Sequence, residues 1–492
     1  MGALVAVLNK KGENVARAAV VMIEALESNG PKAYGIASPT TIKIEESLEA
    51  LNKLRMEAPI ALGYLFSKIL PRDEPQPLKL KDATMVFDGR IYPVDAEKPD
   101  VEIAAKELEQ NPEQASTVFL KKTNGDFAFA IAKPEAIVAA RDIIGVRPLY
   151  YGENADFAAL ASEHKALWSI GIRETRSFPP GCVSVVGIHG FKFTVAKRIV
   201  HSKPKQVTMQ TAAHELRTLL EHSVKERVSG LKEVTVAFSG GLDSSIIAYL
   251  TKKTGADATL IHVSLENEPE VEFARQAAEG LKMSLHICQY VEHDVQKAIP
   301  KVIHIIEEAD PVKVSIGVPM YWTAEKTAEM GCKVMLAGQG ADELFGGYRR
   351  YLDGYLEGSK EKVQTTIYND ITGIHESNLE RDFKICNHFN VELRLPYAAH
   401  NMAKLAISLP LELKMERTDN TLRKLVLRQV ARDLGLPQPI VERPKRAIQY
   451  TTGANKAIKK LAKQEGASTN EYLRKIFQAT FGDFEQPRSC NL

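Results

Sequence analysis

The distribution of apolar and polar positions along the chain changes character near residue 200. Before that point, short apolar segments of strand type alternate with Gly, Pro, Asn and Asp, and helical periodicity covers residues 15–28 and 100–111. We therefore expect a layered α/β domain, dominated by sheet, over residues 1–200. Its strand-type segments are ALVAVL, TMVFDGRIY, DFAFAIA, EAIVAAR and CVSVVG.

A polar, basic stretch, HSKPKQ at 201–206, is the predicted linker, and a helical pattern follows in AAHELRTLLEHSVKERV. Strand and helix patterns then alternate: EVTVAFSG with SSIIAYLTKK, ATLIHVSL with EVEFARQAAEGL, and SLHICQYV with VQKAIPKVIHIIEEA, before KVMLAGQG. This alternation predicts a doubly wound parallel sheet in a second domain, residues 210–492. After Tyr348 the pattern turns helical, and the chain ends in a Lys-rich tail that we expect to be mobile.

Composition and charge narrow the class of function. The chain has 492 residues, 44% hydrophobic and 26% charged, which is typical of a soluble protein of two or more domains. Lys and Arg total 64 and Asp and Glu 62, so charge gives no reason to expect nucleic acid or an anionic membrane as partner. Small-molecule substrates are the better expectation, and a homodimer stays open. Short, interrupted apolar runs near the start predict no signal peptide or membrane span, hence a cytoplasmic protein.

The cysteines give no sign of a structural metal or a disulfide framework. They are scattered and lack CxxC pairing, so we expect buried thiols, with an exposed one in the polar tail. They are Cys182, Cys288, Cys332, Cys386 and Cys490.

The stretch AFSGGLDSSIIAYL at 237–250 lies where the first predicted parallel strand ends and its helix begins. Backbone N–H groups in a glycine turn before a helix N-terminus form an anion site, and a nucleotide phosphate is the natural occupant. The lysine of the GxxxxGKS pattern is missing, so amides, hydroxyls and a metal held by Asp243 must hold the phosphate. A plain strand-to-helix turn capped by serine is the alternative.

SGGLDSS resembles the signature of the ATP pyrophosphatase class, and LAGQGADELFGGYRRY at 336–351 resembles the asparagine synthetase (glutamine-hydrolysing type) family within it. NVELRLPY at 390–397 and RPKRAIQY at 443–450 resemble two further segments of that family. The resemblance implies an ATP-dependent, AMP-forming carbon–nitrogen ligase with ATP and Mg as cofactors. It implies magnesium ligands in Asp243 and Asp342 and a catalytic lysine in Lys445. The implied nucleotide contacts are Ala237, Ser239, Gly240, Gly241, Asp243, Ser244, Val263, Ala337 and Gly338.

The first domain resembles the glutamine amidotransferase domain of the same synthetases, an N-terminal-nucleophile fold, through RDIIGVRPLYYG, ASEHKAL, NGDFAFAIA and FPPG. Its chemistry is not preserved. The family begins Met-Cys-Gly, whereas this sequence reads MGALVAV, and Gly2 offers no nucleophile. Where the family has Asn-Gly-Glu-Ile-Tyr-Asn, this chain has DGRIYP, and we expect Arg90 to repel the ammonium of glutamine. Leu65 or Phe66 stands in place of an arginine, and NGPKAYG replaces Arg-Gly-Pro-Asp. We therefore expect an inactive amidotransferase-like domain.

Gln339 stands where many of the glutamine-dependent synthetases have an acid near the acyl-adenylate. A neutral amide orients a nucleophile but does not serve as a general base. DPVKVSIGVPMYW at 310–322, which offers Lys313 and Ser315, is expected to face the substrate. Three interpretations stay open: an asparagine synthetase that adenylates aspartate and uses free ammonia, a β-lactam synthetase-like or other amide ligase, and a non-catalytic regulator or scaffold. The first is favoured, because a scaffold has no need of two carboxylates beside a phosphate loop.

Overall fold

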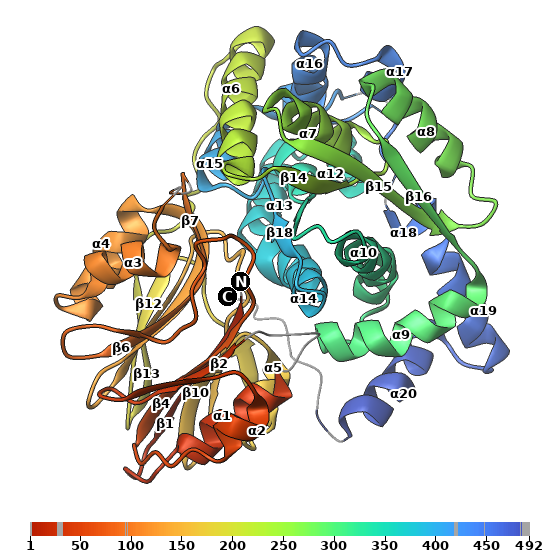
Figure 1. Ribbon diagram of the computed structural model, residues 1–492. Helices are drawn as coiled ribbons and strands as arrows, with labels where there is room; N and C mark the ends of the chain where they lie inside the picture. The colour runs from red at the N-terminus through yellow and green to blue at the C-terminus, as the bar shows by residue number, and fades with distance from the viewer. Residues whose placement is uncertain are drawn as a thin grey trace.

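The computed structural model describes residues 2–26, 33–93, 95, 97–417, 422–446, 448–482 and 484. Two antiparallel sheets form the first part of the chain, for which the sequence predicts a layered domain dominated by sheet, and the predicted parallel sheet forms the second. Figure 1 shows these parts side by side, with α14 (Glu380–His388) and β18 (Glu392–Arg394) on the side of the second that faces the first. The expected α/β fold class is confirmed.

The first sheet has the order β11-β9-β10-β1-β4-β2-β3, and the second β13-β12-β8-β7-β6-β5. Their strands are β1 (Gly2–Asn9), β2 (Ala33–Ala37), β3 (Ile42–Glu45), β4 (Ile60–Phe66), β5 (Leu78–Lys79), β6 (Thr84–Tyr92), β7 (Asn124–Ala132), β8 (Ile137–Arg141), β9 (Tyr150–Glu153), β10 (Phe157–Ala161), β11 (Thr175–Ser177), β12 (Cys182–Gly187) and β13 (Gly190–Val195).

Strand β1 explains the layering of this part. Its side chains alternate between the faces of the first sheet: Leu4 and Ala6 pack in the core between the two sheets, while Val5 and Val7 pack in the core under the helices. Both faces are covered, which is why the strand reads as an unbroken apolar run. The helices are α1 (Ala16–Ala25), α2 (Leu48–Asn52), α3 (Asp100–Leu108), α4 (Pro112–Lys122) and α5 (His164–Trp168).

The parallel sheet has the order β16-β15-β14-β17-β18, and each neighbouring pair is parallel. The carboxyl ends of its strands therefore meet at one edge, where an open α/β sheet binds its ligands. The strands are β14 (Glu233–Ala237), β15 (Asp257–Leu265), β16 (Leu285–Tyr290), β17 (Val334–Leu336) and β18.

The helices of the second part surround this sheet. They are α6 (Met209–Val228), α7 (Leu242–Lys253), α8 (Glu270–Leu281), α9 (Glu292–Ile306), α10 (Pro311–Glu329), α11 (Ala341–Phe345), α12 (Arg349–Leu356), α13 (Lys360–Thr372), the π-helix η1 (His375–Leu379), α14, α15 (His400–Ser408), the 3-10 helix η2 (Leu411–Leu413), α16 (Leu425–Asp433), α17 (Gln438–Val441), α18 (Ile448–Thr451), α19 (Ala454–Gln464) and α20 (Thr469–Phe481).

The Lys-rich end of the chain is more ordered than expected. Helices α19 and α20 bury one apolar face each, with Ile458 and Leu461 on the first and Leu473 and Phe477 on the second. The prediction of a mobile tail is therefore wrong for residues 454–481, and its last segment, with Cys490, lies outside the described residues. Cys182, Cys332 and Cys386 are buried and Cys288 is partly buried, as expected.

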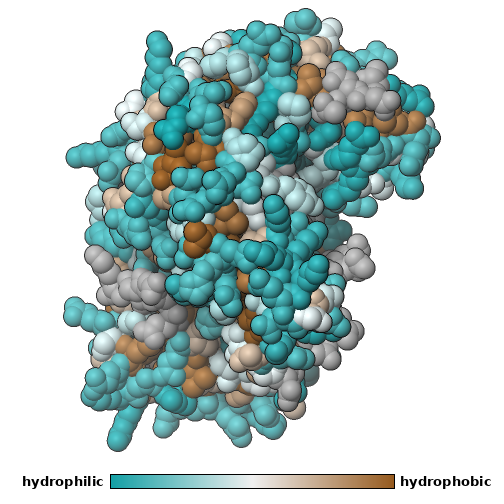
Figure 2. All heavy atoms as spheres, turned by 90° about the vertical axis from the view of Figure 1, so that its right-hand side faces the viewer, coloured by the Kyte–Doolittle hydropathy of each residue, from teal (hydrophilic) through white to brown (hydrophobic). Residues whose placement is uncertain are grey.

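The surface agrees with the composition. On the face drawn in Figure 2, hydrophilic residues predominate and hydrophobic residues gather only in small separate patches. Among the residues that the structure describes, no helix is long and apolar enough to cross a membrane.

Candidate functional site

The turn between β14 and α7 presents backbone groups to the edge of the parallel sheet. Gly240 has φ +68°, a left-handed conformation that glycine adopts without strain. Ser239 Oγ lies 3.3 Å from Ser244 Oγ and accepts a hydrogen bond of 3.2 Å from the Gly241 amide. No side chain caps α7, which leaves its first amides available to an anion.

The second motif lies directly against this turn because Gly338 has no side chain. A Cβ at Gly338 would lie 3.1 Å from Cβ of Asp243 and 3.4 Å from the Ser244 amide nitrogen. The close approach brings the loop after β17 to the start of α7. Asp342, in the first turn of α11, thereby reaches the same site as Asp243.

Two lysines hold these carboxylates together. Lys424 Nζ lies 2.6 Å from Asp243 Oδ2 and 2.7 Å from Asp342 Oδ1, and Lys445 Nζ lies 2.7 Å from Asp342 Oδ2. The Lys424 side chain is 2% exposed, whereas Lys445 is 24% exposed. We call Asp243, Asp342, Lys424 and Lys445 the charge cluster.

The charge cluster is strongly ionic. Burial alone would raise the pKa of Asp342, but the ammonium groups of Lys424 and Lys445 outweigh it and hold that pKa well below its usual range. Burial would lower the pKa of Lys445, but the carboxylates of Asp342 and Asp243 raise it. Both charges are therefore present at neutral pH.

Gln339 lies beside the charge cluster in sequence but has a partner of its own. Its Nε2 donates a hydrogen bond of 2.9 Å to Asp382 Oδ2, and Arg381 clamps the same carboxylate with distances of 2.7 and 3.0 Å. This arrangement leaves the amide oxygen of Gln339 and the second hydrogen of its Nε2 without a partner among the described residues. Asp382 is fully buried on α14, which also contacts the first domain.

The remaining predicted nucleotide contacts lie at or near the carboxyl ends of the same strands. Ala237 ends β14, Val263 is buried in β15, and Ala337 follows β17. Lys313 and Ser315, in contrast, are engaged locally on α10: Lys313 pairs with Glu308 at 2.6 Å, and Ser315 donates to the Val312 carbonyl. We find no contact of these two side chains with the charge cluster among the described residues.

Sequence reasoning missed three members of the site. Lys424 lies in TLRKLVLRQV, a run that reads as a plain amphipathic helix, and its φ of +61° gives no signal in the sequence. Tyr397 donates a hydrogen bond of 3.4 Å to the carbonyl of Asp243. Arg443 donates to the Ser239 carbonyl at 3.3 Å. Tyr397 and Arg443 lie in NVELRLPY and RPKRAIQY, so the available hint was their place in those two segments.

In the first domain, the position expected for a nucleophile has no room for a side chain. A Cβ at Gly2 would overlap the carbonyl oxygen of Leu65, and it would lie 2.5 and 2.6 Å from the Cζ and the hydroxyl oxygen of Tyr64. The Gly2 amide instead donates a hydrogen bond of 3.2 Å to Asp88 Oδ1. Leu65 and Phe66 are both buried in β4.

Arg90 was expected to present a free positive charge to glutamine, but its guanidinium is buried and paired. Its guanidinium is 3% exposed and contacts three carboxylates: Asp73 at 2.6 Å, Asp100 at 3.0 Å and Glu392 at 2.7 Å. The arginine charge is thus neutralised, and the prediction that it repels a glutamine ammonium is wrong. Because Glu392 belongs to β18, Arg90 ties the first domain to the parallel sheet.

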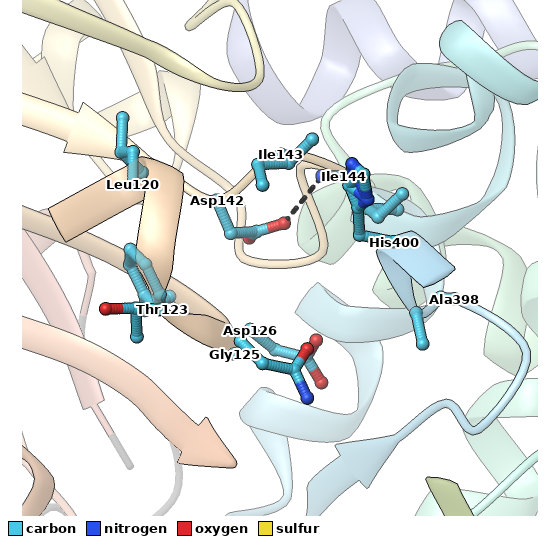
Figure 3. Close-up of a pocket in the computed structure, with 12 residues that line it drawn as sticks. Leu120, Thr123, Gly125, Asp126, Asp142, Ile143, Ile144, Ala398 and His400 are labelled. Atoms are coloured by element: carbon cyan, nitrogen blue, oxygen red, sulfur yellow. Dashed lines mark hydrogen bonds between the residues drawn. The ribbon is translucent and has the colours of Figure 1, made fainter. Parts of the chain in front are cut away.

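A cavity of about 20 Å³ lies between the two domains. Figure 3 shows Asp142 directing its carboxylate to the Ile144 amide, with the His400 ring beside Ile144. Burial lowers the pKa of His400 to about 4, and neither ring nitrogen has a hydrogen-bond partner among the described residues. Asn124, Gly125 and Asp126, from the NGDFAFAIA segment, line the other side.

Comparisons with known proteins identify the family of the chain. A family model described as asparagine synthase matches residues 215–360 and 354–485, and one described as glutamine amidotransferase domain matches residues 65–169. A putative glutamine-hydrolysing asparagine synthetase of Methanocaldococcus jannaschii is 32% identical over 415 residues, which cover 74% of this chain and 76% of that protein. The chain belongs to the asparagine synthase family.

A plant member extends the comparison. Glutamine-hydrolysing asparagine synthetase 2 of Arabidopsis thaliana is 28% identical over 416 residues, which cover 78% of this chain and 69% of that protein. The chain is thus a homologue of asparagine synthetases, and the prediction of an ATP-dependent carbon–nitrogen ligase of this kind is confirmed. Membership of the asparagine synthase family also implies ATP as a substrate.

Proposed function

We propose that the second domain transfers AMP from ATP to the side-chain carboxylate of aspartate, and that ammonia then captures the acyl-adenylate. The carboxylate oxygen attacks the α-phosphorus and pyrophosphate leaves; the nitrogen then attacks the acyl carbon and AMP leaves. The products are asparagine, AMP and pyrophosphate. The observation that carries this proposal is the charge cluster, which lies beside an uncapped helix N-terminus at the carboxyl edge of the parallel sheet.

The binding roles follow from position. Backbone groups of Ser239, Gly240 and Gly241, with the Ser244 hydroxyl, would hold the pyrophosphate portion of ATP. Ala237, Val263, Ala337 and Gly338 would contact the nucleoside along the strand ends. Lys445, the more exposed lysine of the charge cluster, would meet the charge that develops as pyrophosphate departs.

The residues present fit a magnesium ion. Asp243 and Asp342 supply carboxylate oxygens, the ligands that Mg²⁺ prefers, and Asp243 Oδ1 is buried without a hydrogen-bond partner among the described residues. When bound there, the ion would neutralise charge on the phosphates. Among the described residues no group of three or more His, Cys, Asp or Glu gathers as a metal site, so phosphate and water oxygens would complete the coordination.

Gln339 would orient the amine without deprotonating it. Since its amide nitrogen donates to Asp382, its oxygen can accept a hydrogen bond from the incoming nitrogen. The proton released on amide formation would then pass to water or to the departing phosphate. This neutral amide favours a second candidate as well, an amide or lactam-forming ligase with a different acid or amine.

We further propose that the first domain, residues 1–200, has no glutaminase activity and that residues 210–492 form the synthetase domain. The lack of space for a Cβ at Gly2 supports the loss of activity, because a nucleophilic side chain there would overlap the Leu65 carbonyl. The division is supported by the first two sheets, which end at Val195, and by α6, which begins at Met209. The nitrogen source would be free ammonia or another amine.

The test is pyrophosphate release from Mg-ATP by the purified protein, across a panel of carboxylic acids and amines. We expect release with aspartate and ammonium and its loss in a folded Asp243→Ala variant. Pyrophosphate release only with a different acid or a different amine would favour the second candidate. No release with any pair of acid and amine would favour a scaffold. Glutamate formed stoichiometrically from glutamine would overturn the inactive first domain.

A further inference from the structure

Lys424 is fixed between the two carboxylates of the charge cluster. Its side chain is 2% exposed, and its Nζ lies 2.6 Å from Asp243 Oδ2 and 2.7 Å from Asp342 Oδ1. Gly347 packs against it, since a Cβ there would overlap both the Asp342 carboxylate and Cε of Lys424. The backbone is fixed as well, because the Lys424 carbonyl accepts a hydrogen bond of 2.9 Å from the Arg428 amide. The ammonium of Lys424 therefore stays between the carboxylates.

The negative charges of the site do not outnumber the positive ones. Within the charge cluster, the two carboxylates face the two ammonium groups of Lys424 and Lys445. Three further charged groups interact with these carboxylates: Glu343, Arg423 and Arg428. With them the site holds three carboxylates and four cationic groups, so it offers no net attraction to a free divalent cation.

A bound nucleotide would reverse this balance of charge. Its phosphates would lie at the uncapped N-terminus of α7, whose first turn contains Asp243, and would bring several negative charges to the site. They would also bring oxygen ligands, and Mg²⁺ is commonly held by one or two carboxylates together with substrate phosphates. The carboxylates alone are compensated by lysine, whereas the carboxylates and phosphates together are not.

We propose that Lys424 is a built-in counter-ion that keeps Asp243 and Asp342 from binding a divalent cation until a nucleotide is present. This role rests on the magnesium site proposed above, but it does not depend on which acid or amine reacts. Lys445 contributes less to the exclusion, because it contacts only Asp342 and is 24% exposed. Lys424 thus makes metal binding conditional on the nucleotide.

Retention of manganese by the full chain tests this role. Mn²⁺ is the probe because it prefers the same carboxylate and water ligands as Mg²⁺. Ultrafiltration separates the ion held by the protein from the free ion and from its nucleotide complex. The α,β-methylene analogue of ATP replaces ATP, since it lacks the bond that the proposed reaction breaks. We expect the natural protein to retain about one Mn²⁺ per chain with this analogue and almost none without it.

Three variants locate the effect at the charge cluster. Lys424→Met should bind Mn²⁺ without nucleotide about one to two orders of magnitude more tightly than the natural protein, because one carboxylate charge is then uncompensated. Lys445→Met should gain less, and Lys456→Met, an exposed lysine of α19, should behave as the natural protein. Adding Asp243→Asn to Lys424→Met should abolish the gained binding, since it removes a carboxylate ligand.

The melting temperature shows whether each variant is folded and provides a second readout. Mn²⁺ without nucleotide should raise it in Lys424→Met and leave it unchanged in the natural protein. The proposal is overturned if the natural protein retains Mn²⁺ equally with and without the analogue, if folded Lys424→Met gains no retention, or if no Mn²⁺ is retained under any condition. Should Lys424→Met not fold, a gain in Lys445→Met supports the proposal and its absence overturns it. Absence of pyrophosphate release would overturn the proposed reaction but not this role of Lys424.

Discussion

At the scale of single residues, two lysines share the Asp342 carboxylate but have different environments. Lys445 is partly exposed and contacts one carboxylate, whereas Lys424 is buried between two. We expect Lys445→Met to lower the turnover number by about two to three orders of magnitude while the KM for ATP changes only a few-fold, because its charge acts mainly in the transition state. Steady-state pyrophosphate release gives both parameters, and normal turnover with weak ATP binding would contradict this role.

Lys424→Met should instead affect stability. Removing this ammonium leaves Asp243 without its partner and Asp342 with only Lys445, so we expect a loss of about 3 kcal/mol in the free energy of unfolding without Mg. Urea unfolding measures it, with Lys456→Met, an exposed lysine of α19, as the control. Equal stability of the two variants would show that Lys424 does not hold the carboxylates together.

The first domain offers a residue-scale test as well. Gly2→Cys should restore no glutaminase activity and should lower stability, because the new Cβ overlaps the Leu65 carbonyl and the Tyr64 ring. Gly187→Cys is the matched control, since a Cβ there meets nothing within 4 Å. Glutamate release from glutamine by the Gly2→Cys variant, but not by the natural protein, would show that the domain still binds glutamine.

The sequence predicted both carboxylates of the charge cluster, which lie in motifs, and missed Lys424, which reaches the cluster from elsewhere. Asp243 and Asp342 follow the ends of two strands that pair in parallel. This pairing brings both residues to one edge of the sheet, independently of the conformation of the loops. Lys424 reaches the same place from the residue before α16, where its φ is +61°. A left-handed lysine in an amphipathic run carries no local signal of this kind.

At the scale of elements, β18 connects the domains. Its Glu392 is fully buried and contacts Arg90 at 2.7 Å and Arg394 at 2.6 Å. Burial would raise the pKa of Glu392, but these arginines hold it well below its usual range. We expect Glu392→Gln to lower the free energy of unfolding by about 3 to 5 kcal/mol, because two buried guanidinium groups lose a carboxylate.

A double-mutant cycle with Arg90→Met separates this contact from the rest of the network. The two substitutions together should cost less than the sum of the single ones, since each removes the partner of the other. Additive losses would mean that the Arg90–Glu392 pair does not couple the domains.

The pattern missed one element that depends on distant partners and one that has a local start signal. The segment of β18 is three residues long and lies in a region whose pattern predicts helix. Its burial comes from β17 and from Arg90, 302 positions earlier, and neither partner is visible in the local pattern. Helix α4 was missed between residues 112 and 122, although Pro112 at its first turn is a start signal. The longer periodic segments, such as α6 and α9, lie where their patterns predicted them.

At the scale of the whole molecule, buried ionisable groups make stability depend on pH. Burial lowers the pKa of His164 to about 3 and the pKa values of His375, His388 and His400 to about 4. Between about pH 4 and 6.5 the unfolded chain therefore binds protons at these histidines that the folded chain does not, which favours unfolding as the pH falls. Two buried acids act in the opposite sense, since burial raises the pKa of Asp142 to about 6 and that of Glu376 to about 7.

Burial also lowers the pKa of His262 and His304, and it raises the pKa of Glu163, Glu325 and Glu343. Because the histidines with a lowered pKa outnumber the acids with a raised one, unfolding near pH 5 takes up protons. We expect the free energy of unfolding to fall on acidification in this range, by about 1.4 kcal/mol per pH unit for each proton of net uptake. Urea titrations between pH 4.5 and 7 measure this slope. His400→Gln should reduce it by about one proton, because neither ring nitrogen of His400 has a partner to lose, whereas His189→Gln, on the exposed β12–β13 turn, should leave it unchanged. A slope that is flat, or that His400→Gln does not alter, would show that these histidines titrate in the folded protein as they do in water.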